Sequence, residues 1–142
     1  PPPPPPPFLH ADAATRALDS SLVGSEMCIR DRLTADVGDD PLDHQAALAF
    51  MSDAAPSRAA RSPHPDFRND VADRYRFQGA SLDHSVWFHR PSNPTDWHWF
   101  DTRSHGLSGG RGLVTGDVLR ADGLHVATIA QQVLLRRLRD AP

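Results

Sequence analysis

The C-terminal half of the chain contains four apolar, strand-like segments that are separated by turn-forming residues. The segments cover residues 78–89, 96–102, 111–120 and 124–136, and the turn-forming sequences between them include RPSNPT, SHGLSGG and ADG. The last of these is short enough to predict a tight hairpin. Short connections between consecutive strands favour antiparallel pairing. The pattern therefore predicts an antiparallel meander.

One amphipathic segment precedes these strands. In the sequence DHQAALAFMSD, Ala46, Ala49, Phe50 and Asp53 recur at the spacing of one helix face. Asp40 or Asp43 can cap the start of this helix, which we expect over residues 43–53. Residues 54–80 are rich in Pro, Arg, Asp and Ser and show no sustained period, which predicts a long loop that runs into the first strand-like segment.

One helix followed by a meander indicates an α+β fold, not a parallel α/β fold. We expect the helix to lie across the sheet. The side chains expected to be buried between the two are Phe50, Leu82 or Trp87, Val126 and Ile129.

The N-terminal segment has a different character. Residues 1–7 are all proline, which predicts an extended segment that is either a ligand for a proline-binding module or an unstructured tail. Residues 22–32, LVGSEMCIRDR, resemble the in-frame translation of a transposon-end sequencing adaptor over eleven consecutive residues. We therefore expect residues 1–32 to be foreign to the natural gene, disordered and without packed contacts, and residues 33–142 to form the domain.

Composition excludes several classes of function. The chain has 142 residues, a net charge of −3 and no lysine, whereas a nucleic-acid-binding surface needs a basic excess. The single cysteine, Cys28, cannot form an internal disulfide. No apolar run approaches the roughly 20 residues of a membrane span, and no signal peptide is visible. We expect one cytoplasmic domain that binds no nucleic acid and does not span a membrane.

The sequence SLDHSVWFHRP, residues 81–91, contains two histidines. Side chains alternate between the two faces of a strand, so His84 and His89 are expected on opposite faces and cannot share one metal ion. His98 and His105 could join one of them across strands, but no compact Cys/His spacing occurs. We expect no metal and no cofactor. His84 is expected to be a core histidine with a backbone partner.

Other motifs offer little evidence for chemistry. Ser81 lies within a strand and not on the sharp turn of a G-x-S-x-G nucleophile, which the chain lacks. The glycine-rich sequence GLSGGRGL, residues 106–113, lacks the G-K-[ST] ending of a phosphate loop and predicts a turn or a bulge.

Two polar residues interrupt apolar patterns. Asp53 ends the apolar face of the helix, and Gln131 shares a strand face with Ile129 and Val133. A buried polar group without a partner costs about 1 to 3 kcal/mol, so buried positions would require partners. The alternative is that Asp53 ends the helix at the surface and Gln131 emerges at an edge, and composition leaves both alternatives open.

The segments HQAALAFMSD, ASLDHSVWFHRP, DWHWFDTRS, GRGLVTGDV and DGLHVATIAQQ resemble, in order and spacing, the C-terminal half of the acyl-CoA thioesterase II family. The resemblance covers about residues 34–137. It implies a hot-dog fold, in which an antiparallel sheet wraps around a long helix, as the second half of a double hot dog. It also implies hydrolysis of acyl-CoA to a fatty acid and free CoA.

The family's water-holding Asp, Thr or Ser, and Gln fall on Asp53, Ser81 and Gln131. By this resemblance Asp53 is the general base, and Ser81 and Gln131 orient the water. Gln132 departs from the pattern, because the family usually has Glu there.

The family is roughly twice as long as this chain. The resemblance therefore implies a missing N-terminal hot-dog half, a missing first strand that leaves one sheet edge unpaired, and a homo-oligomer in the intact enzyme. The alternative is a non-catalytic hot-dog module that binds an acyl or CoA ligand or serves in interactions, with Asp53, Ser81 and Gln131 apart.

Overall fold

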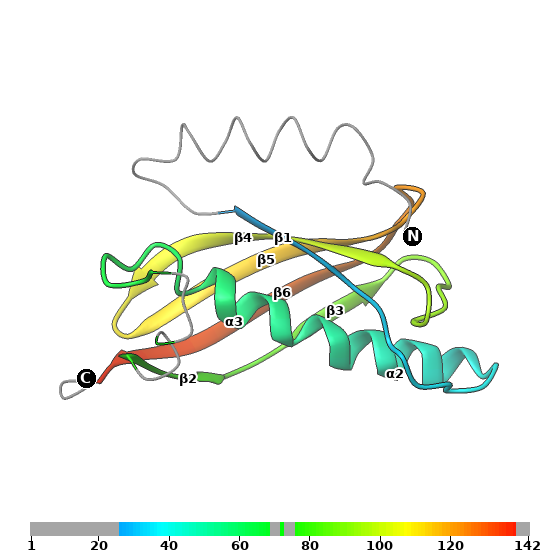
Figure 1. The fold of residues 1–142 in the computed structure, drawn as a ribbon, viewed down its shortest axis with the longest axis horizontal. Coiled ribbons are helices and arrows are strands. Elements are labelled where there is room, and N and C mark those ends of the chain that lie inside the picture. Colours follow the sequence, from blue (N-terminus) through cyan, green and yellow to red (C-terminus); the bar gives the residue numbers. More distant parts are fainter. Residues whose placement is uncertain (1–25, 69–71, 73–75, 139–142) are drawn as a thin grey trace.

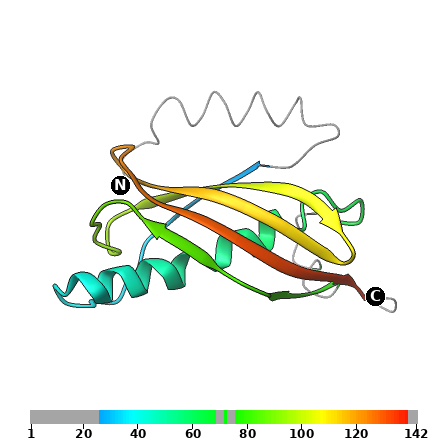
Figure 2. The ribbon, with the colours of Figure 1, turned by 180° about the vertical axis from the view of Figure 1, so that it is seen from behind.

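An antiparallel sheet curls around one helical segment in the computed structural model, which describes residues 26–68, 72 and 76–138 (Figure 1). The elements are β1 (Glu26–Asp31), α2 (Pro41–Ser52), α3 (Ala54–Ala59), β2 (Phe77–Ser81), β3 (Ser85–Phe88), β4 (His98–Ser108), β5 (Arg111–Arg120) and β6 (His125–Arg137). The strand order is β1-β4-β5-β6-β2, and β3 also pairs with β6. Figure 2 shows the sheet from behind, on the face opposite the helices. The predicted α+β arrangement, with a sheet wrapped around a helix, is confirmed.

The strands that turn signals delimit are well predicted. β5 has the predicted bounds, and β6 begins and ends one residue later than predicted. β4 continues beyond the predicted end at residue 102 to Ser108, with a shift of register between Ser104 and Leu107. Gly109 and Gly110, with φ of 57° and 72°, then turn the chain into β5. The glycine-rich segment is therefore both a bulge and a turn, as predicted.

The segment predicted as one strand over residues 78–89 is broken into β2 and β3. Ser81 pairs with Val133 and Ser85 pairs with Ala130, so this edge holds one residue more than the facing part of β6. The extra residue inverts the alternation of side chains beyond it. Ser81 therefore shares the helix-covered face with Val86, which packs on the core, whereas strict alternation had placed the two on opposite faces. That part of the prediction is wrong.

The predicted helix is present but longer than expected. Asp40 caps α2 by accepting a hydrogen bond from the Leu42 amide at 2.8 Å, and Pro41 occupies the first turn, where its missing N–H costs nothing. The loop predicted from residue 54 is wrong for Ala54–Ala59, which form α3. Pro56 suggested a loop, but it lies in the first turn of α3, where proline is tolerated.

The prediction of which face of the helix is buried is also wrong. The buried residues are Leu48, Met51, Ser52 and Ala55, which have the helical spacing shifted by two residues from the predicted set. Phe50 is 78% exposed. Leu82 and Trp87, of which one was expected in the core, are also exposed, at 49% and 53%.

The core lies between the helices and the concave face of the sheet. Leu48, Met51 and Ala55 pack against a set contributed by the central strands: Phe100, Val118, Val126, Ala127 and Ile129. Burial of Val126 and Ile129 is confirmed. Farther along, α3 approaches β5 closely at Gly112, where an added Cβ would lie 3.1 Å from the Ala60 Cβ.

The N-terminal prediction is contradicted for its last part. Glu26–Asp31 form β1, which pairs with β4 in antiparallel register, so the expected unpaired edge beside β4 is occupied. Ile29 and Met27 alternate with more exposed residues and pack against the core clusters. The backbone hydrogen bonds between β1 and β4 do not depend on which side chains β1 carries. The alternation of Met27 and Ile29 with more exposed residues supplies the apolar face that packs on the core. Residues 1–25, including the prolines, lie outside the described residues.

None of the helices in the described ranges is long and apolar enough to cross a membrane.

We expect β1 to contribute to stability. Ile29→Ala should lower the free energy of unfolding by about 1 to 2 kcal/mol, because partly buried apolar surface is lost. Cys28→Ser, at the adjacent exposed position, should change it by less than about 0.5 kcal/mol. Urea denaturation would measure both, and equal stability of Ile29→Ala and the unsubstituted chain would contradict the contribution of β1.

His98, at the start of β4, is fully buried. Its Nδ1 donates to the Asp96 carbonyl at 2.8 Å, and its Nε2 accepts from the Ser92 hydroxyl at 2.7 Å, which satisfies the neutral ring. Burial lowers the pKa of His98 below the ordinary value of 6.5, although the bond to Asp96 acts in the opposite direction. The unfolded chain therefore binds a proton at His98 more readily than the folded chain.

This difference predicts a loss of stability in acid. As pH falls below 6.5, the unfolded state takes up the proton first, and His98 should lower the free energy of unfolding by up to about 1.4 kcal/mol per pH unit. His98→Asn should remove this component, and His105→Asn, at an exposed position, should keep it. Urea denaturation between pH 7.5 and 5 would compare the slopes, and identical slopes for all three proteins would exclude a role of His98.

Candidate functional site

Asp53 lies at the junction of α2 and α3. Pro56 has no N–H to donate to the Ser52 carbonyl, so the helical hydrogen bond that would cross this junction cannot form. The backbone of Asp53 nevertheless stays in the right-handed helical region, with φ −70° and ψ −25°. The helix therefore continues in direction while its regular bonding is interrupted at Asp53, whose side chain is partly exposed.

Ser81 is the last residue of β2 and pairs with Val133 of β6. Directly opposed residues point to the same face, and Val133 belongs to the buried face, so Ser81 points toward the helices. The side chain remains exposed because it lies at the sheet edge, where the strand is interrupted.

Gln131 lies in the middle of β6, paired with Val114 of β5. It shares the helix-covered face with Ile129 and Val133 and is fully buried. Of the two alternatives, burial with partners is the one observed, and emergence at an edge is excluded.

These three side chains form a closed triangle of hydrogen bonds. The Ser81 hydroxyl donates to Asp53 Oδ1 at 2.8 Å, and Gln131 Nε2 donates to the same oxygen at 2.8 Å. The second hydrogen of Gln131 Nε2 goes to Ser81 Oγ at 2.7 Å. The structure thus brings together all three residues that were singled out from the sequence, from one helix junction and two strands.

The three hydrogen bonds of the triangle run in one consistent order from donor to acceptor. Gln131 only donates, Ser81 accepts one hydrogen bond and donates another, and Asp53 accepts two. This pattern fits an ionised carboxylate at Asp53, because a carboxylate is an acceptor only. The other amide atom, Gln131 Oε1, is buried and has no partner among the described residues. The arrangement can hold a polar molecule beside a carboxylate at the protein surface.

His84 lies beside this triangle, and its partner was not predicted. Its Nε2 contacts the Ser52 hydroxyl at 2.8 Å, whereas a backbone partner was expected. Ser52 immediately precedes Asp53 and is fully buried. No local sequence pattern signals this contact, because the two residues are 32 positions apart.

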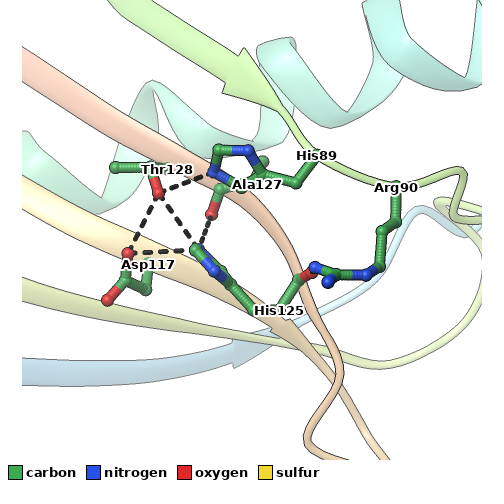
Figure 3. A network of polar contacts seen from close by, with 6 residues as sticks. All are labelled: His89, Arg90, Asp117, His125, Ala127 and Thr128. Atoms are coloured by element: carbon green, nitrogen blue, oxygen red, sulfur yellow. Dashed lines mark hydrogen bonds and ion pairs between the residues drawn. The ribbon is translucent and has the colours of Figure 1, made fainter.

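A second polar network lies on the opposite face of the sheet (Figure 3). His89 Nε2 and His125 Nε2 both contact the Thr128 hydroxyl, at 2.9 and 3.0 Å, and Asp117 lies 3.2 Å from His125. Arg90 donates to the His125 carbonyl at 2.7 Å. His84 and His89 thus point to opposite faces, as predicted. Within the described residues no group of three or more His, Cys, Asp or Glu could hold a metal ion.

Comparison with known proteins identifies a family to which the chain is similar. Residues 5–135 match the acyl-CoA thioesterase C-terminal domain family. Acyl-CoA thioesterase 2 of Haemophilus influenzae is 36% identical over 102 residues, which cover 70% of this chain and 34% of that protein. The chain therefore spans about a third of the length of this relative.

Solved structures agree. An acyl-CoA thioesterase II of Mycobacterium marinum superimposes with a TM-score of 0.68 at 32% identity, over 82% of this chain and 44% of that one. A Streptococcus mutans protein solved with acetyl CoA superimposes with a TM-score of 0.61 at 12% identity, over 81% and 84% of the two chains. The sheet wrapped around a helix is therefore the hot-dog fold that the family resemblance implies.

The triangle predicts an unusual response to substitution. Gln131→Met keeps the shape of the side chain and removes a buried acceptor without a partner; it also removes two donated hydrogen bonds, but Asp53 and Ser81 are accessible to water, which can replace them. The free energy of unfolding should therefore rise by about 1 kcal/mol. Gln132→Met, at the exposed neighbouring position, should change it by less than about 0.5 kcal/mol. Thermal unfolding would compare the two, and strong destabilisation by Gln131→Met would show that the triangle is a net stabilising element.

Proposed function

The chain belongs to the acyl-CoA thioesterase C-terminal domain family, and we propose that its site hydrolyses acyl-CoA thioesters to a fatty acid and free CoA. The observation that carries this proposal is the triangle of Asp53, Ser81 and Gln131, with all three distances between 2.7 and 2.8 Å. A carboxylate, a hydroxyl and an amide that meet at a partly exposed surface can hold and activate a water molecule.

In the proposed reaction, Asp53 is the general base. Its Oδ1 accepts from Ser81 and Gln131, while Oδ2 has no hydrogen bond within the described part of the chain and can accept a proton from water. The water oxygen adds to the thioester carbonyl as its proton passes to Asp53. The C–S bond then breaks, and the CoA sulfur takes up the proton.

Ser81 and Gln131 position the base and the water. The two hydrogen bonds to Oδ1 fix the plane of the carboxylate, so that Oδ2 has a defined direction. Positioned acid–base groups of this kind typically contribute about 10² to 10⁴-fold to a rate. Because Ser81 and Gln131 also bond to each other, loss of either residue would loosen the other.

The competing function is a non-catalytic hot-dog module that binds an acyl or CoA ligand or serves in interactions. Such a module needs the helix and the sheet but has no need for Asp53, Ser81 and Gln131 to meet. Their convergence from sites 28 to 78 positions apart supports hydrolysis over binding alone.

We further propose that the working enzyme includes an N-terminal hot-dog half, associates as a homo-oligomer and acts in the cytoplasm. The relatives are longer than this chain, which spans 34% of one and 44% of another. Exposed apolar side chains offer surface for such a partner: Leu42 on α2 is 72% exposed, and Phe50 and Trp87 are also exposed.

Substitution of the base tests the proposal. Asp53→Asn should lower kcat by about 10² to 10⁴-fold, because an amide cannot accept the proton. Ser81→Ala should cost less, because it removes a positioning group and leaves the base. Both would be measured as release of free CoA from an acyl-CoA, in this chain and in a fusion behind the N-terminal half of the Mycobacterium marinum relative.

The control is Asp117→Asn, which makes the same chemical change on the opposite face of the sheet and should leave the rate unchanged. Full activity of Asp53→Asn would overturn its assignment as the base. Acyl-CoA binding without turnover in both unsubstituted proteins would favour the binding module.

A further inference from the structure

We propose that His84 is a positioning residue for Asp53, acting through the Ser52 hydroxyl; this inference rests on the proposed function. His84 lies in the interruption between β2 and β3, and Ser52 is the last residue of α2. Their contact joins the irregular sheet edge to the helix junction at 2.8 Å. This hydrogen bond thus connects the sheet edge that carries Ser81 to the helix junction that carries Asp53.

The hydrogen-bond directions define the state of the ring. Ser52 Oγ donates its single hydrogen to the Ala49 carbonyl at 2.8 Å, so it must accept from His84. His84 Nε2 therefore carries a hydrogen, and in the neutral ring Nδ1 has none. Nδ1 is buried and has no partner among the described residues. A histidine present only for stability would be expected to have both nitrogens satisfied.

The position of Ser52 explains why this hydrogen bond acts on Asp53. The regular helical bond from the Ser52 carbonyl is lost because residue 56 is proline, so the junction lacks one backbone constraint. A serine hydroxyl bonded to the carbonyl one turn earlier also tends to bend a helix. The bond from His84 fixes this hydroxyl, and with it the turn from which the Asp53 carboxylate points to Gln131.

Hydrogen bonds to β6 also fix the interrupted sheet edge that carries His84. The Leu82 amide donates to the Gln132 carbonyl at 2.9 Å, and Asp83 Oδ1 accepts from the Gln132 amide at 2.7 Å. These bonds anchor the interruption to β6, next to Gln131. His84 therefore extends from a segment that is fixed to Gln132, the neighbour of Gln131, toward Ser52, the neighbour of Asp53.

Four variants test the role. His84→Ala and Ser52→Ala should each lower kcat by about ten- to a hundredfold, since a displacement of about 1 Å can cost 10²-fold, while KM changes less than about twofold. His84→Gln retains an N–H donor in place of Nε2 and should restore kcat to within about threefold of the unsubstituted protein. The double variant His84→Ala with Ser52→Ala should lose no more than either single variant, because both remove one interaction.

The matched control is His105→Ala. His105 Nε2 contacts the Thr115 hydroxyl at 2.7 Å, which is the same kind of pair at an exposed position away from the site. This variant should leave kcat and KM unchanged. Additive losses in the double variant, or equal losses in His84→Gln and His84→Ala, would overturn the proposal.

A spectroscopic measurement separates this inference from the proposed function. The ¹³Cγ resonance of Asp53 and the side-chain amide resonances of Gln131 should shift in His84→Ala and Ser52→Ala, return in His84→Gln, and stay unchanged in His105→Ala. The unsubstituted ring should show the Nε2–H tautomer in its ¹⁵N spectrum. Absence of hydrolysis with these shifts present would defeat the proposed function alone, whereas an unshifted Asp53 resonance in His84→Ala would defeat the positioning role.

Discussion

The contact between the helix and the concave face of the sheet determines where everything else lies. Leu48, Met51 and Ala55 pack into the sheet, and burial of apolar surface is the main force that holds the layers together. Asp53 and Ser52 lie within this same stretch, so the packing that docks the helix also brings a carboxylate and a hydroxyl to the sheet. The sheet meets these groups with Gln131 and with the interrupted edge at Ser81 and His84. The polar groups bond to one another beside this apolar core, although Gln131 Oε1 and His84 Nδ1 are buried without partners among the described residues.

Local sequence signals predicted most of the sheet. Turn residues delimited β5 and β6 to within one residue, and the glycines between residues 106 and 113 marked the bulge and the turn. Asp53 and Gln131 stood out as polar interruptions of apolar patterns, but periodicity could not identify their partners. Ser81 was singled out through family resemblance, because strict alternation placed it away from Val86. One additional residue in the edge strand changes that assignment, and no local signal marks it.

The remaining errors share a cause, which is that the deciding contacts are distant in sequence. Phe50 fits a helical spacing as well as Met51 does, and only the docked sheet selects Met51. Glu26–Asp31 resemble an adaptor in sequence, yet the free edge of β4 can pair with any backbone that offers an alternating apolar face. The bond between His84 and Ser52 depends on the helix and the interrupted edge coming together, which composition does not reveal.

Gly112 allows α3 to lie close against β5. A Cβ there would lie 3.1 Å from the Ala60 Cβ, so the C-terminal end of α3 would have to move away from β5. α3 begins directly after Asp53, so a shift of α3 away from β5 would also move the backbone that carries the Asp53 carboxylate. The absence of a side chain at position 112 therefore sets how closely α3 lies against β5, and with it the placement of Asp53 relative to Gln131.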